Sequence, residues 1–337
     1  MKVGIVGASG FTGSELLRLC AGRPDLDVAA VTAERHAGEA VAALYPSLAA
    51  YGGLRYTATS ADAVDGLDLV FLCLPHGASQ DLVPDLVDRV GTLVDLAADF
   101  RLRRPELYTE WYGEPHRAPQ LLGTFAYGLP ELFRDGIVGA TRIAAPGCYP
   151  TAAALALRPL VDAGVVATSG IVVDAASGVS GAGTKLAQAT QFTTVDEGFA
   201  AYGLLRHRHT PEIEQAAGAE VLFTPHLAPM NRGILATCYA PAASPGLATA
   251  DVVGVLRDRY AGEPFVVVGD APPSTKAVAG SNAAHLAARV DERTGWVLVL
   301  CAIDNLVKGA AGQALQAANV ALGLPEAAGL TAVGVYP

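Results

Sequence analysis

The 337-residue chain lacks the features that mark exported, membrane-spanning or nucleic-acid-binding proteins. It has no window of about 18 uninterrupted apolar residues, and its N-terminus, MKVGIVGASG, runs directly into glycines instead of forming a signal peptide. Lys and Arg number 23 against 33 Asp and Glu, a net charge of −10 with no basic run to offset it. This balance disfavours nucleic acid and anionic membranes as partners. We expect a cytoplasmic protein.

Closely spaced pairs of cysteines are also absent from the sequence. The five cysteines lie dozens of residues apart with no C-x-x-C spacing, so the sequence predicts neither a disulfide framework nor a metal site. Repeats and low-complexity linkers are missing as well. With 51% hydrophobic residues, the chain is long enough for about two globular domains.

The first part of the chain has the pattern of a parallel α/β domain. Short apolar, β-branched runs alternate with helical stripes, which is typical of strands buried under helices on both faces. The predicted strands are Lys2–Val6, Asp27–Val31, Asp68–Leu74 and Thr92–Leu96, and the predicted helices are Phe11–Ala21 and a stretch around Leu82–Val90. Pro84 predicts a kink or a helix start within the latter.

A glycine-rich loop follows the first predicted strand. The spacing G-x-x-G-x-x-G at a strand-to-helix junction permits a tight turn and directs helix N–H groups at a pyrophosphate. The candidate dinucleotide-binding residues of the loop are Gly7, Ser9, Gly10, Phe11, Thr12 and Gly13. The alternative is a glycine-rich turn that binds nothing, because the commoner spacing is G-x-G-x-x-G.

The second predicted strand ends in residues that bear on cofactor choice. Thr32 at the strand end and Arg35 beyond it suit the 2′-phosphate of NADP, whereas Glu34 could hold the ribose 2′-hydroxyl of NAD. The sequence favours NADP.

Beyond Cys148 the pattern changes to that of an α+β domain with a mixed sheet. Asp291–Gly295 reads as a hairpin turn between two strands. The predicted strands are Ile171–Asp174, Ile234–Tyr239, Ala287–Asp291 and Trp296–Ile303, and the predicted helices are Thr151–Leu160, Pro211–Ala217, Thr249–Tyr260 and Asp304–Leu322. We therefore predict a Rossmann-type domain of residues 1–147 and 305–337 and a catalytic and dimerisation domain of residues 148–304.

Cys148 is the candidate nucleophile. It lies in a turn fixed by Pro and Gly directly before a predicted helix, with Thr151 as a possible N-cap, and a helix N-terminus favours a thiolate. The alternative is a buried structural cysteine, which is the expectation for Cys20, Cys73, Cys238 and Cys301.

The segment His207-Arg-His209-Thr-Pro-Glu212 contains the candidate base for this thiol. His209 precedes a predicted helix N-terminus, which disfavours the imidazolium, and Glu212 is near enough in sequence to orient it. The alternative is a solvent-facing turn.

Two further segments follow predicted strands. Arg101 comes after a strand of the parallel sheet and suits an anionic group, although a surface ion pair is an equal alternative. The loop Ser177–Gly183, with Ser177 and Gly178, could approach a cofactor closely or be a flexible connector.

Taken together and in order, eight motifs make the chain resemble the N-acetyl-gamma-glutamyl-phosphate reductase family of arginine biosynthesis. That family lies within the aspartate-semialdehyde dehydrogenase and glyceraldehyde-phosphate dehydrogenase class. The likeness spans essentially the whole chain. The motifs are Val6–Gly13, Leu74–Gly77, Ala98–Arg101, Tyr127–Glu131, Pro146–Thr151, His207–Glu212, Gly233–Ala236 and Ala302–Gly309.

The resemblance implies an NADPH-dependent reduction of an acyl phosphate through a thioester on Cys148, with the His209 region as acid and base. It also implies that Asn305 and Pro75 lie at the cofactor, that Arg101 holds the leaving phosphate, and that His207 and Tyr202 contact the substrate. The sequence leaves open which of His207 and His209 faces Cys148. A homo-oligomer, dimer or tetramer, is expected by analogy.

Three rivals remain at this point. The first is the related reductase of carrier-bound aminoadipyl phosphate in lysine biosynthesis, which the net negative charge disfavours because such a carrier is expected to be acidic. The second is aspartate-semialdehyde dehydrogenase, whose pattern lacks the His-Arg-His-Thr-Pro-Glu string. The third is a nucleotide-binding protein without activity.

Overall fold

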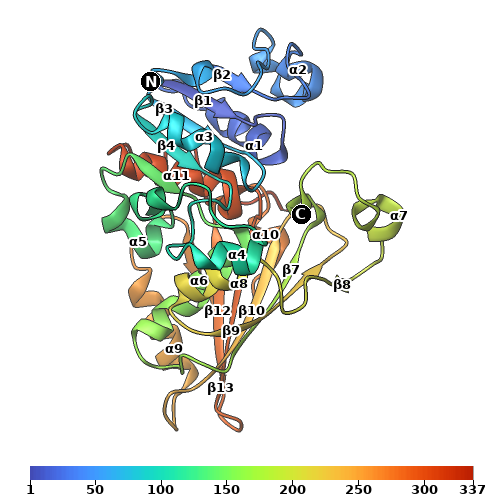
Figure 1. The fold of residues 1–337 in the computed structure, drawn as a ribbon. Coiled ribbons are helices and arrows are strands. Elements are labelled where there is room, and N and C mark those ends of the chain that lie inside the picture. Colours follow the sequence, from blue (N-terminus) through green and yellow to red (C-terminus); the bar gives the residue numbers. More distant parts are fainter. Residues whose placement is uncertain (337) are drawn as a thin grey trace. The chain divides into compact units, whose positions relative to one another are not determined.

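The computed structural model describes residues 1–336, and these divide into two compact units (Figure 1). Unit 1 comprises Met1–Pro146 and Ala310–Leu330, and unit 2 comprises Gly147–Gly309 together with the described residues from Thr331 onward. The boundaries differ from the expected ones at the C-terminal side. The chain re-enters unit 1 at Ala310 instead of residue 305, and it leaves unit 1 again after Leu330.

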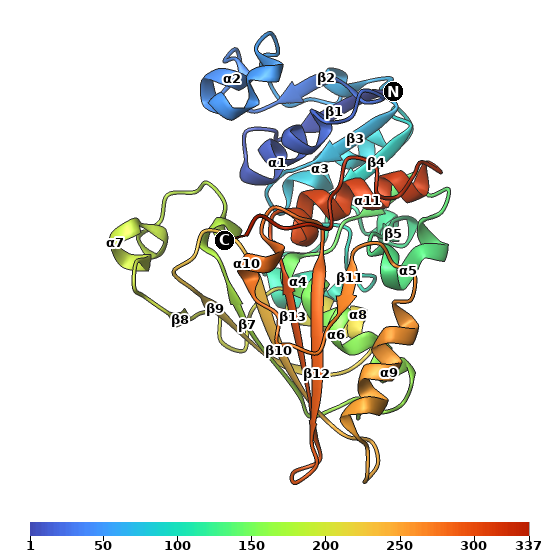
Figure 2. The ribbon, with the colours of Figure 1, turned by 180° about the vertical axis from the view of Figure 1, so that it is seen from behind.

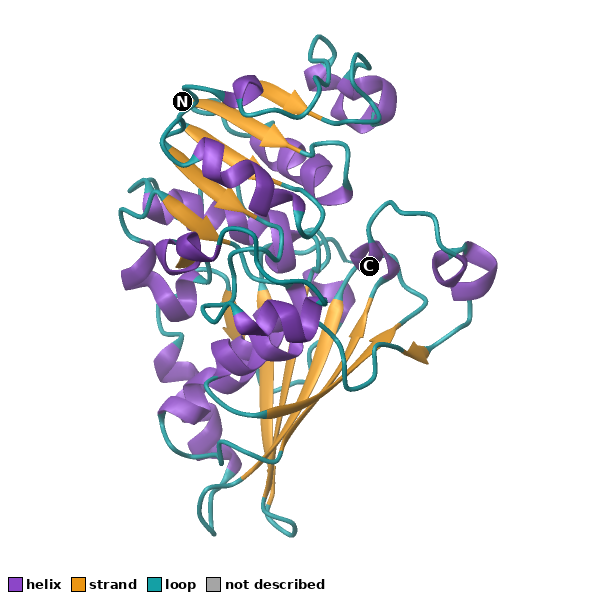
Figure 3. Ribbon diagram, viewed as in Figure 1, coloured by secondary structure: helices purple, strands orange, loops and turns teal. Residues whose placement is uncertain are grey.

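Unit 1 is built on a six-stranded parallel sheet with the order β2-β1-β3-β4-β6-β5 (Figure 3). Its strands are β1 (Lys2–Val6), β2 (Asp27–Thr32), β3 (Leu69–Leu72), β4 (Thr92–Asp95), β5 (Ala126–Tyr127) and β6 (Arg142–Ala144). Because β2 and β3 lie on opposite sides of β1, the chain order reverses there. Open α/β sheets bind ligands beyond the carboxyl ends of strands at such a reversal.

Helices cover both faces of this sheet (Figure 2). On one face α1 (Phe11–Cys20) and α11 (Gly312–Ala321) share a core with Val3 and Ile5, while α3 (Ala78–Leu86) packs on the other face with Val6. The two faces therefore use alternate residues of one strand, which explains its uninterrupted apolar run. The remaining helical segments are α2 (Val41–Leu44), α4 (Glu106–Tyr112), α5 (Pro130–Ile137), η1 (Pro46–Tyr51), η2 (Asp62–Val64) and η3 (Pro119–Thr124).

Unit 2 is built on a seven-stranded sheet with the order β11-β12-β13-β10-β7-β9-β8. Its strands are β7 (Ile171–Ser177), β8 (Ala200–Ala201), β9 (Val221–Leu227), β10 (Ile234–Pro241), β11 (Val266–Val268), β12 (Ala284–Asp291) and β13 (Trp296–Ile303). The pairs β7–β9 and β11–β12 are parallel and the others antiparallel, so the predicted mixed sheet is confirmed. The predicted hairpin also forms, with Asp291 paired to Trp296.

Helices α6 (Cys148–Asp162), α8 (Thr210–Ala217) and α9 (Thr249–Arg259) pack on one face of this sheet, over buried residues such as Cys238 and Val299. The opposite face leaves Leu222, Tyr239 and Trp296 partly exposed, and α10 (Thr275–Val278) packs near its end. Between β7 and α8 the chain forms η4 (Val179–Ala182), η5 (Gln188–Thr190) and α7 (Phe192–Val195). We call residues 183–199, which project from the sheet in Figure 1, the arm.

The helix predicted over 304–322 is wrong at its start. Strand β13 runs to Ile303, and the Asp304 carboxylate accepts the amides of Leu306 and Val307 at 2.8 and 3.0 Å. This side chain ends the extended segment, so a π-helical turn, η6 (Val307–Ala311), precedes α11.

The helix predicted around Leu82–Val90 is α3, which begins at Ala78 and not near Pro84. The Asp99 carboxylate accepts the amides of Gly77 and Ser79 at 2.9 and 3.1 Å, and this long-range cap sets the helix start. Local sequence could not show a cap that comes from a residue 20 positions away.

Candidate active site

Cys148 is the first residue of α6 and is half-buried. Gly147 is the N-cap, with an extended backbone, and not Thr151 as predicted. The Thr151 hydroxyl instead donates to the Gly147 carbonyl at 2.9 Å. The N-cap residue is a glycine and has no side chain to cap this helix, and the positive end of the helix dipole acts on Cys148. This environment favours a thiolate.

Glu212 supports the backbone beside the thiol. It is fully buried in the first turn of α8, and its Oε1 accepts the Gly147 N–H at 2.8 Å. Sequence reasoning assigned Glu212 to orienting His209. The structure gives it a contact with the residue directly before Cys148, which was not foreseen because it joins positions 65 residues apart.

Gly309 lies against Cys148. A Cβ built at this position would be 2.7 Å from the Cys148 Cβ, closer than real side chains approach. A glycine is therefore required here for the π-helical turn to pass Cys148. The motif Ala302–Gly309 carried this residue, but nothing in its spacing revealed the contact.

A cavity of about 490 Å³ opens at Cys148 within unit 2. It brings together six residues that the sequence singled out separately: Cys148, Ser177, Gly178, Tyr202, His207 and His209. Arg208 also lines it, and the arm contributes small residues such as Thr190 and Gly198. The residues from three distant motifs thus share one site.

His207 is held as a neutral ring. The His209 amide donates to its Nδ1 at 3.1 Å, so that nitrogen carries no proton and Nε2–H is the donor. Burial, assisted by the neighbouring charge of Arg208, lowers the pKa of His207 to about 4. The ring is therefore uncharged at neutral pH.

Aromatic rings surround these histidines. Tyr149 lies edge-on to both His207 and His209, with centroids 5.7 and 5.9 Å away. Its hydroxyl is 3.0 Å from the hydroxyl of Tyr202 and donates to the His226 carbonyl at 3.3 Å. Burial raises the pKa of both tyrosines, that of Tyr202 to about 12, so both remain protonated. Tyr149 was missed, although its place next to Cys148 was the available signal.

The loop after β7 begins at Ser177 and Gly178, and Asn305 is hydrogen-bonded to it. The Gly178 amide donates to the Gly233 carbonyl at 2.8 Å, and a Cβ on Gly178 would lie 2.6 Å from the Asn231 carbonyl oxygen. The buried Asn305 accepts the Gly233 amide at 2.7 Å and donates to Ser180 Oγ at 3.0 Å. Asn305 therefore holds this loop, and its predicted contact with the cofactor stays a prediction.

The glycine loop of unit 1 fits a dinucleotide pyrophosphate. Gly7 has a φ of +78°, and a Cβ there would lie 2.5 Å from the Cys73 carbonyl oxygen. A Cβ on Gly13 would lie 2.5 Å from the Ala8 Cα, so the turn and the helix pack too closely for any side chain. Gly10 is the N-cap of α1, and no side chain caps that helix. Its first amides, from Phe11 onward, are therefore available to an anion.

The other predicted cofactor residues of unit 1 fall into two groups. Thr32 is fully buried and accepts the Gly7 amide at 3.3 Å, so it supports the loop. Arg35 and Pro75 are exposed after β2 and β3, at the carboxyl edge of the sheet. Glu34, the rival partner for a ribose hydroxyl, accepts the Thr59 amide at 2.8 Å.

Arg101 is buried and serves the backbone of unit 1. Its Nε and Nη2 donate to the carbonyls of Ala145 and Leu96, both at 2.8 Å. It does not lie at the surface, and two of its donor groups bond main-chain carbonyls. Its predicted role in holding the phosphate stays a prediction.

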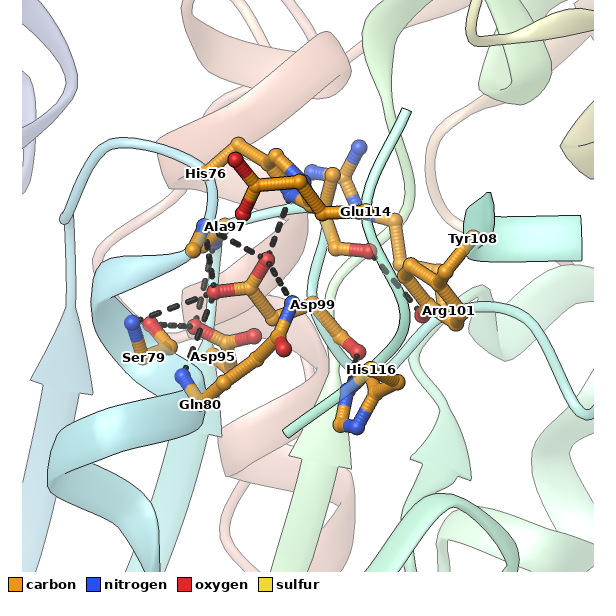
Figure 4. A network of polar contacts seen from close by, with 12 residues as sticks. His76, Ser79, Gln80, Asp95, Ala97, Asp99, Arg101, Tyr108, Glu114 and His116 are labelled. Atoms are coloured by element: carbon orange, nitrogen blue, oxygen red, sulfur yellow. Dashed lines mark hydrogen bonds and ion pairs between the residues drawn. The ribbon is translucent and has the colours of Figure 1, made fainter. Parts of the chain in front are cut away.

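Near Arg101, Asp99 organises a polar network (Figure 4). His76 Nδ1 lies 2.5 Å from the Asp99 carboxylate, and Gln80 donates to it as well. Burial works against the charged form of Asp99, but the hydrogen bonds from His76 and Gly77 outweigh it and lower its pKa. For Asp95, burial and the nearby Asp99 raise the pKa to about 7. None of these residues was singled out from the sequence by role.

Among the described residues, no cluster of His, Cys, Asp and Glu is arranged to hold a metal ion. None of the described helices combines the length and hydropathy that crossing a bilayer requires.

Two family models match this chain. The one described as "Semialdehyde dehydrogenase, NAD binding domain" matches residues 2–140, and "Semialdehyde dehydrogenase, dimerisation domain" matches residues 148–305. An N-acetyl-gamma-glutamyl-phosphate reductase of Symbiobacterium thermophilum is 50% identical over 347 residues, which cover 100% of this chain and 99% of the relative. The corresponding reductase of Magnetococcus marinus is 46% identical with the same coverage. This chain belongs to the N-acetyl-gamma-glutamyl-phosphate reductase family.

Solved structures support the fold of this reductase family member. Aspartate semialdehyde dehydrogenase II of Vibrio cholerae matches with a TM-score of 0.71 at 17% identity, over 95% of this chain and 97% of that chain. Aspartate semialdehyde dehydrogenase of Candida albicans, solved with NADP, matches with a TM-score of 0.65 at 14% identity, over 95% and 97%. The predicted family and fold class are thus confirmed.

Proposed function

We propose that this chain reduces N-acetyl-gamma-glutamyl phosphate with NADPH, giving N-acetylglutamate semialdehyde and phosphate. The observation that carries the proposal is the cavity in which Cys148, the first residue of a helix, meets His207 and His209. This arrangement occurs in a chain that is 50% identical to a reductase of that name.

The first step is acyl transfer to the thiol. The Cys148 thiolate attacks the acyl carbon, a C–S bond forms, and the C–O bond to phosphate breaks, so phosphate leaves with the bonding electrons. The negative charge that develops on the carbonyl oxygen is stabilised by the positive end of the α6 dipole, because Cys148 is the first residue of that helix. Glu212 keeps this turn in place through Gly147.

The second step reduces the thioester. NADPH, when bound, supplies the hydride, and the residues suited to hold its pyrophosphate are Gly7, Gly10 and the first amides of α1. His209 protonates the substrate oxygen and takes that proton back when the C–S bond breaks, which releases the aldehyde and regenerates the thiolate. His207 donates from Nε2 and does not titrate near neutrality, so the shuttle role goes to His209.

The preference for NADP rests on Arg35. Its guanidinium is exposed beyond β2, whereas Glu34 is engaged by the Thr59 amide. A guanidinium suits a 2′-phosphate. We expect Arg35→Gln to raise KM for NADP⁺ about tenfold and to leave KM for NAD⁺ unchanged.

The decisive experiment runs the reaction backwards. Purified protein is given N-acetylglutamate semialdehyde, phosphate and NADP⁺, and NADPH formation is followed by absorbance. We expect phosphate-dependent turnover that Cys148→Ser lowers by about a thousandfold or more, while Cys73→Ala leaves it intact. Turnover that survives in Cys148→Ser would refute the thioester mechanism. Preference for a carrier-bound aminoadipate semialdehyde would point to the lysine pathway instead.

Alkylation gives an independent test of the nucleophile. Burial raises the pKa of the Cys20 and Cys301 thiols to about 12 and also raises those of Cys73 and Cys238. Iodoacetamide followed by peptide mass spectrometry should therefore label Cys148 first. Equal labelling of all five cysteines would favour a nucleotide-binding protein without activity.

We also propose that the protein is a cytoplasmic homo-oligomer. Unit 2 matches a model described as a dimerisation domain, and its sheet has one face that leaves Leu222, Tyr239 and Trp296 partly exposed. The free cysteines and the use of NADPH suit a reducing compartment.

A further inference from the structure

The cavity at Cys148 has one permanently charged side chain among the described residues that line it. That residue is Arg208, which lies between the two histidines and is exposed to solvent. The other lining residues are apolar or uncharged polar groups, apart from Cys148 and the histidines, and include no Lys, Asp or Glu. A negatively charged ligand in this cavity would find the permanent positive charge of the cavity at Arg208.

His207 does not share that task. Its Nδ1 accepts a backbone amide, and its ring stays neutral because it is buried among Tyr149, Tyr202 and Phe223. The ring can donate one hydrogen bond to a ligand but offers no net charge.

The charge of Arg208 acts on the groups inside the cavity. Burial is the main cause of the lowered pKa of His207, and Arg208 adds to it. Burial also raises the pKa of Tyr202, and Arg208 opposes that rise. Arg208, His207 and Tyr202 line the same cavity, which is why the charge of the guanidinium acts on both rings.

Arg101, which the sequence suggested as the phosphate ligand, is committed elsewhere. It is buried in unit 1, where two of its nitrogens donate to main-chain carbonyls. Arg208, by contrast, lines the cavity at Cys148 with a side chain that is exposed to solvent.

We propose that Arg208 binds the anionic group of the acyl substrate and thereby determines which acyl compounds this cavity accepts. The proposal rests on the proposed function, under which the substrate carries a carboxylate and a phosphate. Both groups match the planar, bidentate donor pattern of a guanidinium. An uncharged acyl compound of the same length would lack this contact and would be a poor substrate.

The kinetic test separates the two anions, because the reverse reaction takes them as different molecules. Arg208→Gln should raise KM for either phosphate or the semialdehyde by about 10- to 100-fold, the usual effect of one lost charge-assisted hydrogen bond, while KM for NADP⁺ stays constant. A higher KM for phosphate would show that Arg208 binds the phosphoryl group. A higher KM for the semialdehyde would show that it binds the carboxylate. Arg208→Lys should recover part of the loss. Arg206→Gln is the matched control, since Arg206 is exposed on the same segment but does not line the cavity.

Alkylation tests the same inference without substrate or cofactor. Iodoacetate and iodoacetamide react with the same thiol but differ in charge, so the ratio of their rates at Cys148 measures attraction of an anion to the cavity. We expect the ratio to fall several-fold in Arg208→Gln, to be retained in Arg208→Lys and Arg206→Gln, and to fall with added salt in the unaltered protein.

The outcomes are distinct. Unchanged KM values for both phosphate and semialdehyde, or an alkylation ratio that is the same in Arg208→Gln and Arg206→Gln, would overturn the role of Arg208 even if Cys148→Ser abolishes turnover. If the unaltered protein turns over none of the semialdehydes, the proposed function fails. The alkylation ratio then still decides whether Arg208 attracts anions to Cys148.

Discussion

At the scale of single residues, the reactivity of Cys148 depends on what touches its backbone. Its thiol lies at the start of α6, where Gly147 is tied to Glu212 on one side and Gly309 passes close to its Cβ on the other. Covalent catalysis needs the sulfur within a fraction of an ångström of its working position. The residues that fix this position therefore also affect the rate.

Gly309→Ala tests this positioning. A Cβ at Gly309 would stand 2.7 Å from the Cys148 Cβ, so one of the two segments must shift. We expect kcat to fall by about tenfold to a hundredfold with a smaller change in KM, measured in the reverse reaction. Gly254→Ala is the matched control, because its Cβ would meet nothing within 4 Å in α9, and it should leave kcat unchanged.

At the scale of elements, α6 and α8 are joined by a hydrogen bond between a helix N-cap and a buried carboxylate. The bond runs from the Gly147 amide to Glu212 Oε1 and joins the helix that begins at Cys148 to the helix that follows His207 and His209. This hydrogen bond therefore links the motifs Pro146–Thr151 and His207–Glu212.

Glu212→Ala should weaken both stability and catalysis. It leaves the Gly147 amide without its acceptor, which costs about 1 to 3 kcal/mol of unfolding free energy by urea titration, and it lowers kcat. Glu212→Gln retains an oxygen at the same place and should recover most of the stability. A Glu212→Ala protein with unaltered urea midpoint would show that this bond contributes nothing.

The network at α3 and β4 makes the stability of unit 1 depend on pH. Asp95 is fully buried, with its pKa raised from 3.8 to about 7 by burial and by Asp99. Its folded form holds a proton that the unfolded form loses, so this group lowers stability as pH rises from about 4 to about 7, with no further change above.

Asp95→Asn removes that titration. An amide keeps an oxygen to accept from Ser79 Oγ, at 2.8 Å, and from the Ala97 amide, at 3.1 Å. We expect the variant to be more stable than the unaltered protein at pH 8, by about 1 kcal/mol or more, and equal to it at pH 4. Thermal unfolding across this range measures the difference. Parallel pH profiles for the two proteins would contradict the raised pKa.

At the scale of the whole molecule, one face of the unit 2 sheet lacks the helices that cover the other. Leu222 and Tyr239 lie on either side of Val172 in the strand register and therefore on the same face of the sheet. More than a third of the surface of each side chain is exposed. Such an apolar patch on a domain of this description suits association with a second copy.

Charge on that face should break the assembly. We expect the double variant Leu222→Lys with Tyr239→Lys to give a smaller species than the unaltered protein in size-exclusion chromatography with light scattering. Val138→Lys, at an exposed apolar position of unit 1, should not change the mass. If both variants keep the original mass, the oligomer uses another surface.

The sequence by itself determined the local secondary structure, the fold class and the family. Alternation of strands and helices indicated a parallel sheet followed by a mixed one, and ordered motifs such as Pro146–Thr151 identified the family, because these signals lie within a few consecutive residues. The tertiary structure alone decided which side chains meet. Glu212 reaches Gly147, Gly309 approaches Cys148, Arg101 turns to the backbone, and Arg208 lines the cavity. These contacts join segments many residues apart, and their partners follow from packing and burial, which no local spacing encodes.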